Sequence, residues 1–198
     1  AAEHLPFTFG VAASSCVPES PFASAGAAFT VKEVRALIEE HGAIGVAEVM
    51  NYPAVINGDP MFRDIIATAG WRRVDGHAPG LRGPQLDAYL AAGVESDHEV
   101  FELDEAHEKR QKGMWVFLRQ GSVSQDLVRL LPTVVSHGTT ATSFCTDDRE
   151  PDLLRDEGHL NHCIRLAVES GLSVIDALCV ASYYPAQYHN FFHLGSLG

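Results

Sequence analysis

The sequence lacks the features typical of secreted, membrane-spanning and polyanion-binding proteins. Its four cysteines are scattered without a CxxC pair, which indicates reduced thiols rather than a disulfide framework or a structural zinc site. No apolar run approaches the roughly 18–20 residues that a membrane-spanning helix needs. Basic residues are few, because 14 Lys and Arg stand against 26 Asp and Glu and leave a net charge of −12. We therefore expect a cytoplasmic protein that binds neither membranes nor nucleic acid.

Glycine-rich phosphate-binding motifs are also missing. Neither GxGxxG nor GxxxxGK[ST] follows an apolar run, so the nucleotide-binding versions of an open sheet lose support. Hydrophobic residues make up 46% of the 198 residues, which is enough for a sizeable core. No linker or low-complexity stretch divides the sequence, and we expect one domain over residues 1–198. Both ends are abrupt, so we expect this domain to be part of a longer protein.

Short apolar runs alternate with segments of helical spacing. The expected strands are Phe7–Ser15, Ala43–Met50, Trp71–Asp75, Val94–Glu99, Met114–Leu118 and Thr140–Cys145. The expected helices begin at a Thr30–Glu33 capping box, at Pro60, at Leu81, at Asp104 as a cap, at Ser124, at Leu160 and at Ser173. Near-continuously apolar strands separated by helices predict a parallel sheet with crossover helices, which is an α/β fold. An open doubly wound sheet and a (β/α) barrel both fit this spacing.

Polar side chains stand at the carboxyl ends of the expected strands, where parallel α/β folds build their active sites. Glu48, His77, His98 and Asp147 come from four different strands. Imidazole and carboxylate groups together are ligands for Zn, Mn or Fe, and a bridging carboxylate suits a two-metal site. The pattern therefore predicts a metal centre at this edge of the sheet.

Each of these residues also has a structural interpretation. Glu48 could pair with a buried cation, and either histidine could be a hydrogen-bonded core residue. Asp147 could cap the following helix, although Asp148 is better placed to do so.

Two further polar residues are candidates for substrate contact. Arg119 ends an expected strand and could bind substrate or lie on the surface. Asn51, just past Glu48, could orient a ligand or make a turn.

The chain resembles the adenine deaminases of the amidohydrolase superfamily over essentially its whole length. The resemblance is carried by the stretches Ala47–Val55, Asp75–Leu81, Glu95–Glu99 and Phe144–Arg149, and by Ile175–Leu178, Ala181-Ser182 and Tyr184–Ala186 in the tail. It implies a metal-dependent (β/α)8 TIM-type barrel, of which this chain is similar to about six βα units, strands three to eight. The family's flanking β domain and its first two strands are absent from the sequence.

Site roles follow from the resemblance position by position. Glu48 would bridge two divalent metals (Mn, Fe or Zn). His77 and His98 would complete the ligand set of one metal. Asp147 would bind the other metal and act as proton shuttle. The family also uses a His-x-His pair on its first strand, and this sequence contains none. We therefore expect weak metal binding and little activity from these 198 residues alone.

The implied reaction is hydrolysis of adenine to hypoxanthine and ammonia, with a small-molecule purine as the substrate. Other functions stay open: another amidohydrolase acting on a cyclic amide or an amino sugar, or an α/β scaffold without catalysis. Because a partial barrel exposes strand edges that can pair with another chain, we also expect a homo-oligomer.

Overall fold

The computed structural model describes residues 7–20 and 22–196 and contains six strands and several helices. The strands are β1 Ala13–Ser14, β2 Gly45–Val49, β3 Arg73–Gly76, β4 Ser96–Asp97, β5 Trp115–Arg119 and β6 Thr142–Cys145. The helices up to β6 are α1 Val31–Glu39, α2 Tyr52–Ile56, α3 Pro60–Thr68, α4 Gly83–Ala91, α5 Leu103–Gln111, α6 Leu127–Leu130 and α7 Pro132–His137. After β6 come α8 Pro151–Asp156, α9 Leu160–Glu169, α10 Val174–Leu178, the π-helix η1 Cys179–Tyr183 and α11 Tyr184–Tyr188. Among the described residues, no helix is both long and apolar enough to cross a membrane.

All paired strands run parallel, which confirms the expected α/β fold. The strands form two three-stranded sheets in the orders β1-β2-β3 and β4-β5-β6. A backbone hydrogen bond of 3.0 Å from the N–H of Glu95 to the carbonyl of Val74 joins the two sheets. The strands therefore follow one another in space in the order of the sequence, and their carboxyl ends lie along one edge.

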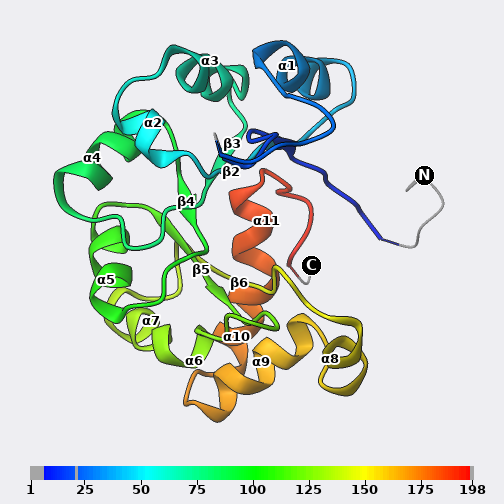
Figure 1. The fold of residues 1–198 in the computed structure, drawn as a ribbon. Helices are drawn as coiled ribbons and strands as arrows, with labels where there is room; N and C mark the ends of the chain where they lie inside the picture. Colours follow the sequence, from blue (N-terminus) through cyan, green and yellow to red (C-terminus); the bar gives the residue numbers. More distant parts are fainter. Residues whose placement is uncertain (1–6, 21, 197–198) are drawn as a thin grey trace.

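The helices between the strands cover one face of this arrangement, as Figure 1 shows for α4, α5 and α7. Val46, Val49 and Val74 pack against α1, α3 and α4 in one core cluster. A second cluster joins Val116 and Leu118 of β5 to α5, α6, α9 and η1. Because side chains alternate along a strand, the residues between these valines and leucines point to the opposite face. That opposite face carries Glu48 of β2 and Asp75 of β3.

The opposite face is partly filled by α11, which lies across the strands from α4 and α5 in Figure 1. The ring of Tyr188 packs against Trp115 and Phe117 of β5, with ring centroids 4.9 and 5.2 Å apart. Its hydroxyl donates to Asp75 Oδ1 at 2.8 Å, and its carbonyl accepts from Arg73 Nε at 2.7 Å. One buried tyrosine thus joins the two sheets on the face opposite the helices.

Helix ends follow the local sequence in several places. The capping box of α1 is present, since Thr30 Oγ1 accepts from the N–H of Lys32 and Glu33 accepts from the N–H of Thr30. Asp59 caps α3 through the N–H of Met61 at 2.8 Å, directly before a proline in the first turn.

The first expected strand is wrong in extent and in burial. Only Ala13–Ser14 of Phe7–Ser15 is a strand, and Phe7 and Phe9 are 56% and 61% exposed. The apolar run predicted a strand buried on both faces, but the first residues of this run have no neighbouring strand within the described chain.

Three helix expectations also need correction. Asp104 lies inside the first turn of α5, whose N-cap is Glu102, so Asp104 does not cap it. The helix expected from Ser124 begins only at Leu127, and the sequence pattern missed the short helices α2, α7 and α8. Short helices fix too few residues for a clear 3.6-residue pattern, which explains why they were missed.

Candidate metal centre

The backbone of β2 places Glu48 on the polar face of the sheet. The pairing between β2 and β3 shifts register between Val46 and Val49, so the strand carries an extra residue there. Such a bulge re-aims the side chains within it. The valines on either side stay in the core, while Glu48 points to the opposite face beside the ends of β3 and β4.

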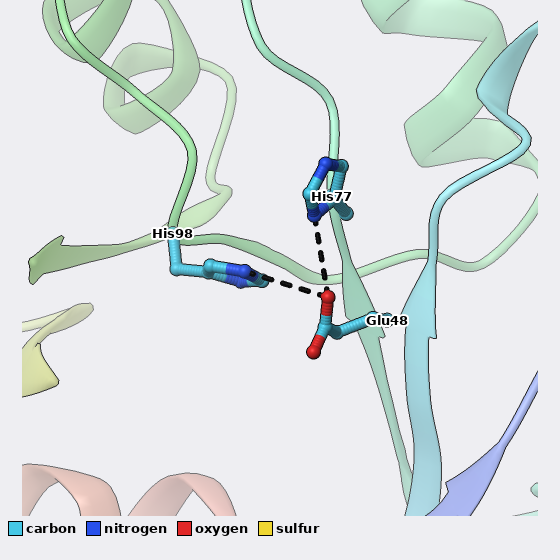
Figure 2. A group of neighbouring side chains, drawn as sticks. All are labelled: Glu48, His77 and His98. Carbon is cyan, nitrogen blue, oxygen red and sulfur yellow. Dashed lines mark hydrogen bonds and ion pairs between the residues drawn. The ribbon is translucent and has the colours of Figure 1, made fainter. Parts of the chain in front are cut away.

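Glu48 lies against the two predicted histidines (Figure 2). Its Oε2 is 3.2 Å from Nδ1 of His77 and 3.7 Å from Nε2 of His98. The two imidazole rings meet edge to face with centroids 5.4 Å apart. These three side chains, which come from the carboxyl ends of three successive strands, thus direct one oxygen and two nitrogens to one point.

A second trio shares His98 with the first. Nε2 of His98 lies 3.6 Å from Glu99 Oε1 and 3.7 Å from Asp147 Oδ2. Asp147 follows β6 and adopts a left-handed backbone conformation with φ of 55°. Non-glycine residues seldom adopt this conformation, and such strain concentrates at functional sites.

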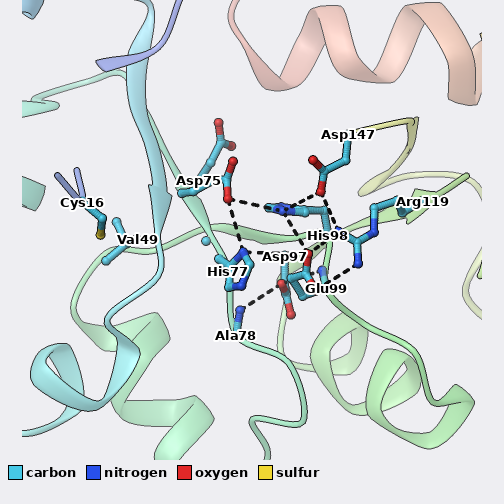
Figure 3. Close-up of polar contacts among 12 residues, drawn as sticks. Cys16, Val49, Asp75, His77, Ala78, Asp97, His98, Glu99, Arg119 and Asp147 are labelled. Carbon is cyan, nitrogen blue, oxygen red and sulfur yellow. Dashed lines mark hydrogen bonds and ion pairs between the residues drawn. The ribbon is translucent and has the colours of Figure 1, made fainter. Parts of the chain in front are cut away.

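Arg119 lies between the two carboxylates of the second trio (Figure 3). Its guanidinium donates from Nη1 to Asp147 Oδ2 at 2.5 Å and from Nη2 to Glu99 Oε2 at 3.0 Å, with a further Nη1 contact to Glu99. Two acidic groups therefore hold Nη1 and Nη2 of Arg119, while its buried Nε has no hydrogen-bond partner among the described residues. Burial lowers the pKa of Arg119, but the hydrogen bond that Arg119 donates to Asp147 and the charge of Glu99 outweigh it and raise that pKa.

The first trio carries opposite pKa shifts. The hydrogen bond from His77 lowers the pKa of Glu48 below its ordinary value, with the charge of His98 adding to the effect. Burial opposes protonation of His77, yet its hydrogen bond to Glu48 and the charge of Glu99 raise the pKa of His77. Because its pKa is lowered, Glu48 stays ionised, and its negative charge favours a cation at this cluster.

A cavity of about 240 Å³ opens beside these residues. Its lining consists of Ala47, Glu48, Asp75, His98, Phe117, Cys145 and Asp147. Phe117 supplies an aromatic wall, while the carboxylates and the imidazole stand on the other side. Small-molecule sites have this composition, with apolar walls and a few convergent polar groups.

The residues present fit a divalent metal. Each trio has ligand atoms that all lie within 4.8 Å of one another. Two ligands about 2.0–2.2 Å from a tetrahedral metal lie roughly 3.3–3.6 Å apart, which is close to the separations between His98 and its neighbours. Nitrogen and carboxylate donors suit Zn, Mn or Fe.

All four predicted metal ligands lie together, but two predictions about neighbouring residues need comment. Asp148 does not cap a helix, because its carboxylate accepts from the N–H of Val123 and the N-cap of α8 is Glu150. Asn51 caps α2 by accepting from the N–H of Ala54 at 3.2 Å, which is a local backbone role.

Sequence reasoning gave no role to Glu99, although it directly follows His98 in the Ser96–Glu99 stretch. It also missed Asp97, whose buried carboxylate accepts from the N–H groups of Ala78 and Glu99. An acid on each side of a candidate ligand histidine is the signal that could have found both residues.

The sequence is similar to those of known adenine deaminases. An adenine deaminase of Syntrophobacter fumaroxidans is 42% identical over 197 residues, covering 100% of this chain and 34% of the relative. An adenine deaminase of Archaeoglobus fulgidus is 43% identical over 188 residues, covering 94% of this chain and 33% of the relative. The chain thus spans about a third of the length of these curated relatives.

The fold has solved counterparts. The crystal structure of an amidohydrolase superposes with a TM-score of 0.54 at 15% identity, covering 85% of this chain and 48% of that one. No family model matches the sequence. The chain is therefore homologous to a segment of adenine deaminases and has an α/β fold similar to that of an amidohydrolase.

Proposed function

We propose that this chain, as a homologue of a one-third segment of adenine deaminases, forms the metal-binding part of an enzyme that hydrolyses adenine to hypoxanthine and ammonia. One observation carries the proposal most strongly. Over almost its entire length the chain is similar to adenine deaminases, and three of the four residues predicted as ligands line one cavity while the fourth, His77, lies against Glu48.

We further propose that the six strands are part of a (β/α)8 barrel and that residues 1–198 form a single domain. The order of the parallel strands, with helices covering one face of them, supports this arrangement. In such a barrel the candidate ligands occupy the carboxyl-terminal rim.

The proposed centre is binuclear, with Mn, Fe or Zn. Glu48 would bridge the metals, His77 and His98 would complete one site, and Asp147 would bind at the other. A bound divalent cation supplies Lewis acidity, which makes water a strong nucleophile at neutral pH. Glu99, which lies 3.6 Å from His98, would add negative charge beside the second site.

The chain's own residues would then move the protons of the reaction. In the proposal, water adds to the purine carbon that bears the exocyclic amine. Asp147 accepts the proton of that water at Oδ2 and passes it to the leaving ammonia, so that one water is consumed and one ammonia released. Release of Asp147 from Arg119 would free this oxygen for the transfer. Phe117 would offer its ring as a wall for the planar base.

The remaining expectations belong to the same proposal. We propose a cytoplasmic homo-oligomer with a small purine as its substrate and a place in purine metabolism. Free cysteines at positions 16, 145, 163 and 179 agree with a reducing compartment.

The experiment is a deamination assay of the full-length protein of which this chain is expected to be a part, loaded with Mn²⁺ or Fe²⁺, following ammonia release and loss of adenine absorbance. We expect turnover in the wild type and its loss in His98→Ala, because both trios share His98. His107→Ala is the matched control, since His107 pairs with His137 on the helix side of the fold. Metal-loaded protein that does not turn over adenine would contradict the proposal, and turnover of cyclic amides instead would favour another amidohydrolase.

A further inference from the structure

A fully buried ion cluster lies directly behind the candidate metal centre. Nζ of Lys109, on α5, is 2.5 Å from Asp97 Oδ2 and 2.5 Å from Glu105 Oε1. The side chains of these three residues are at most 2% exposed. We call Asp97, Lys109 and Glu105 the ion triad.

The ion triad is hydrogen-bonded to the backbone just after each of the two candidate ligand histidines. Asp97 Oδ1 accepts from the N–H of Ala78 at 3.1 Å and from the N–H of Glu99 at 3.0 Å (Figure 3). Lys109 Nζ donates to the carbonyl of Ala78 at 2.7 Å. Ala78 follows His77, while Asp97 and Glu99 flank His98.

Glu105 extends this attachment along the same loop. Its Oε1 accepts from the N–H of Gly80 at 2.8 Å as well as from Lys109. The loop after His77 is therefore fastened at two points to α5. Because the other end of the triad is part of the His98 loop, the two loops are fastened to each other through Lys109.

Stability alone gives no reason for such a cluster. Removing three charges from water is costly, and replacement of buried ion pairs by apolar side chains is often neutral or stabilising. Asp97 instead accepts from the N–H groups of both Ala78 and Glu99, so its carboxylate ties the backbone after His77 to the backbone after His98.

We propose that the ion triad is a positioning device that fixes the His77 and His98 loops relative to each other and thereby sets the affinity of the metal centre. This inference rests on the proposed metal site but not on adenine as the substrate. Its residues touch neither metal nor substrate, and they act through the backbone that carries the ligands.

The test is a Co²⁺ titration of the intact protein, with visible absorption as the readout. In Lys109→Met we expect the dissociation constant to rise by about 10–100-fold, the effect typical of residues that orient metal ligands. We also expect the visible band at saturating Co²⁺ to change shape, because the ligand geometry relaxes. Lys112→Met is the matched control: it makes the same change on the same helix at a lysine that pairs with Asp87 and Glu108 near the surface.

Glu105→Gln is the second variant, for the case in which Lys109→Met does not fold. It keeps the volume and an acceptor for Gly80 but removes the charge that faces Lys109, and we expect about a tenfold loss of affinity. A merely structural triad would lower the melting temperature and leave the Co²⁺ affinity and spectrum of the folded protein unchanged. That result, in whichever of the two variants folds, overturns the proposal.

The outcomes separate this inference from the proposed function. If wild-type protein fails to bind Co²⁺, both the metal centre and the positioning role are wrong. If it binds Co²⁺ with the expected losses in the variants but does not deaminate adenine, the positioning role stands and the proposed reaction falls.

Discussion

Arg119 makes contacts in the structure that differ from both roles expected from its sequence position. Its place at the end of a strand indicated either a substrate contact or a surface arginine. In the structure its side chain is 11% exposed and pairs with Glu99 and Asp147. Two acidic side chains at the site therefore share one guanidinium, which keeps their mutual repulsion in check.

Replacing Arg119 by Met should leave Glu99 and Asp147 without their cation. We expect the free energy of unfolding to fall by about 1.5–3 kcal/mol, the range for hydrogen bonds to charged groups. A divalent metal should recover part of this loss, because it can neutralise the same carboxylates. Urea denaturation with Mn²⁺ and with EDTA measures both effects. Arg129→Met, at a largely exposed arginine, serves as the control. Unchanged stability of Arg119→Met in EDTA would show that the ion pairs of Arg119 contribute nothing to the free energy of unfolding.

At the scale of elements, the close approach of β3 and β4 depends on Gly76. A Cβ at this position would lie 2.2 Å from the carbonyl oxygen of Ser96 and 2.8 Å from a methyl of Val94. Backbone cannot give way as a side-chain tip can, so the two sheets would have to separate where His77 begins.

We therefore predict that Gly76→Ala lowers the free energy of unfolding by about 1–3 kcal/mol or more, the usual cost of overpacking. The metal affinity should fall as well, since the shift displaces His77. Gly26→Ala is the control, because nothing lies within 4 Å of a Cβ built there. Thermal unfolding and Co²⁺ titration of both variants test this, and equal stability of the two variants would contradict the expected clash with the Ser96 carbonyl.

The contact between α4 and α5 predicts a dependence of stability on pH. Glu108 accepts from Arg82 Nε at 2.8 Å and from the N–H of Gly83 at 2.6 Å, and the Arg82 hydrogen bond is the main cause that lowers the pKa of Glu108 to about 2.

Because this pKa is lower in the folded state than the ordinary value of 4.5, the unfolded state binds protons first as the pH falls. The contribution of Glu108 is therefore complete above pH 4.5 and is lost between 4.5 and about 2. We expect Glu108→Gln to be less stable than wild type at pH 6, by less than about 1 kcal/mol for a group near the surface, and nearly equal at pH 2.5. Urea denaturation at both pH values measures the difference, and a constant difference would refute the assignment.

Five of the six strands and the candidate ligands could be predicted from the sequence because each leaves a local signal. Glu48 interrupts an apolar run, and His77, His98 and Asp147 each follow one. Lys109 left no such signal, because α5 is charged on most of its surface and predicts a solvated helix. Its burial depends on Asp97, which is 12 residues earlier in the sequence. Tyr188 was missed for the same reason, since its partner Asp75 is 113 residues away.

At the scale of the whole molecule, metal binding should stabilise the fold, since the candidate ligands follow four strands. At free Mn²⁺ 100-fold above its dissociation constant, the gain is about 2.7 kcal/mol. We expect a higher melting temperature of the intact protein with Mn²⁺, reversed by EDTA. The double variant Glu48→Gln, His98→Ala should show no metal-dependent shift. A shift of equal size in this variant would place the stabilising metal elsewhere.

The position of Tyr188 also bears on the order in which the molecule is completed during synthesis. Its hydroxyl meets Asp75 across 113 residues, so the partner strand leaves the ribosome well before α11 does. At a synthesis rate of 5–20 residues per second, roughly 6–23 seconds pass between the synthesis of Asp75 and that of Tyr188. During that interval the strand face beside the metal centre stays without its aromatic cover. The nascent chain therefore exposes this face to solvent and to chaperones until the last helix docks.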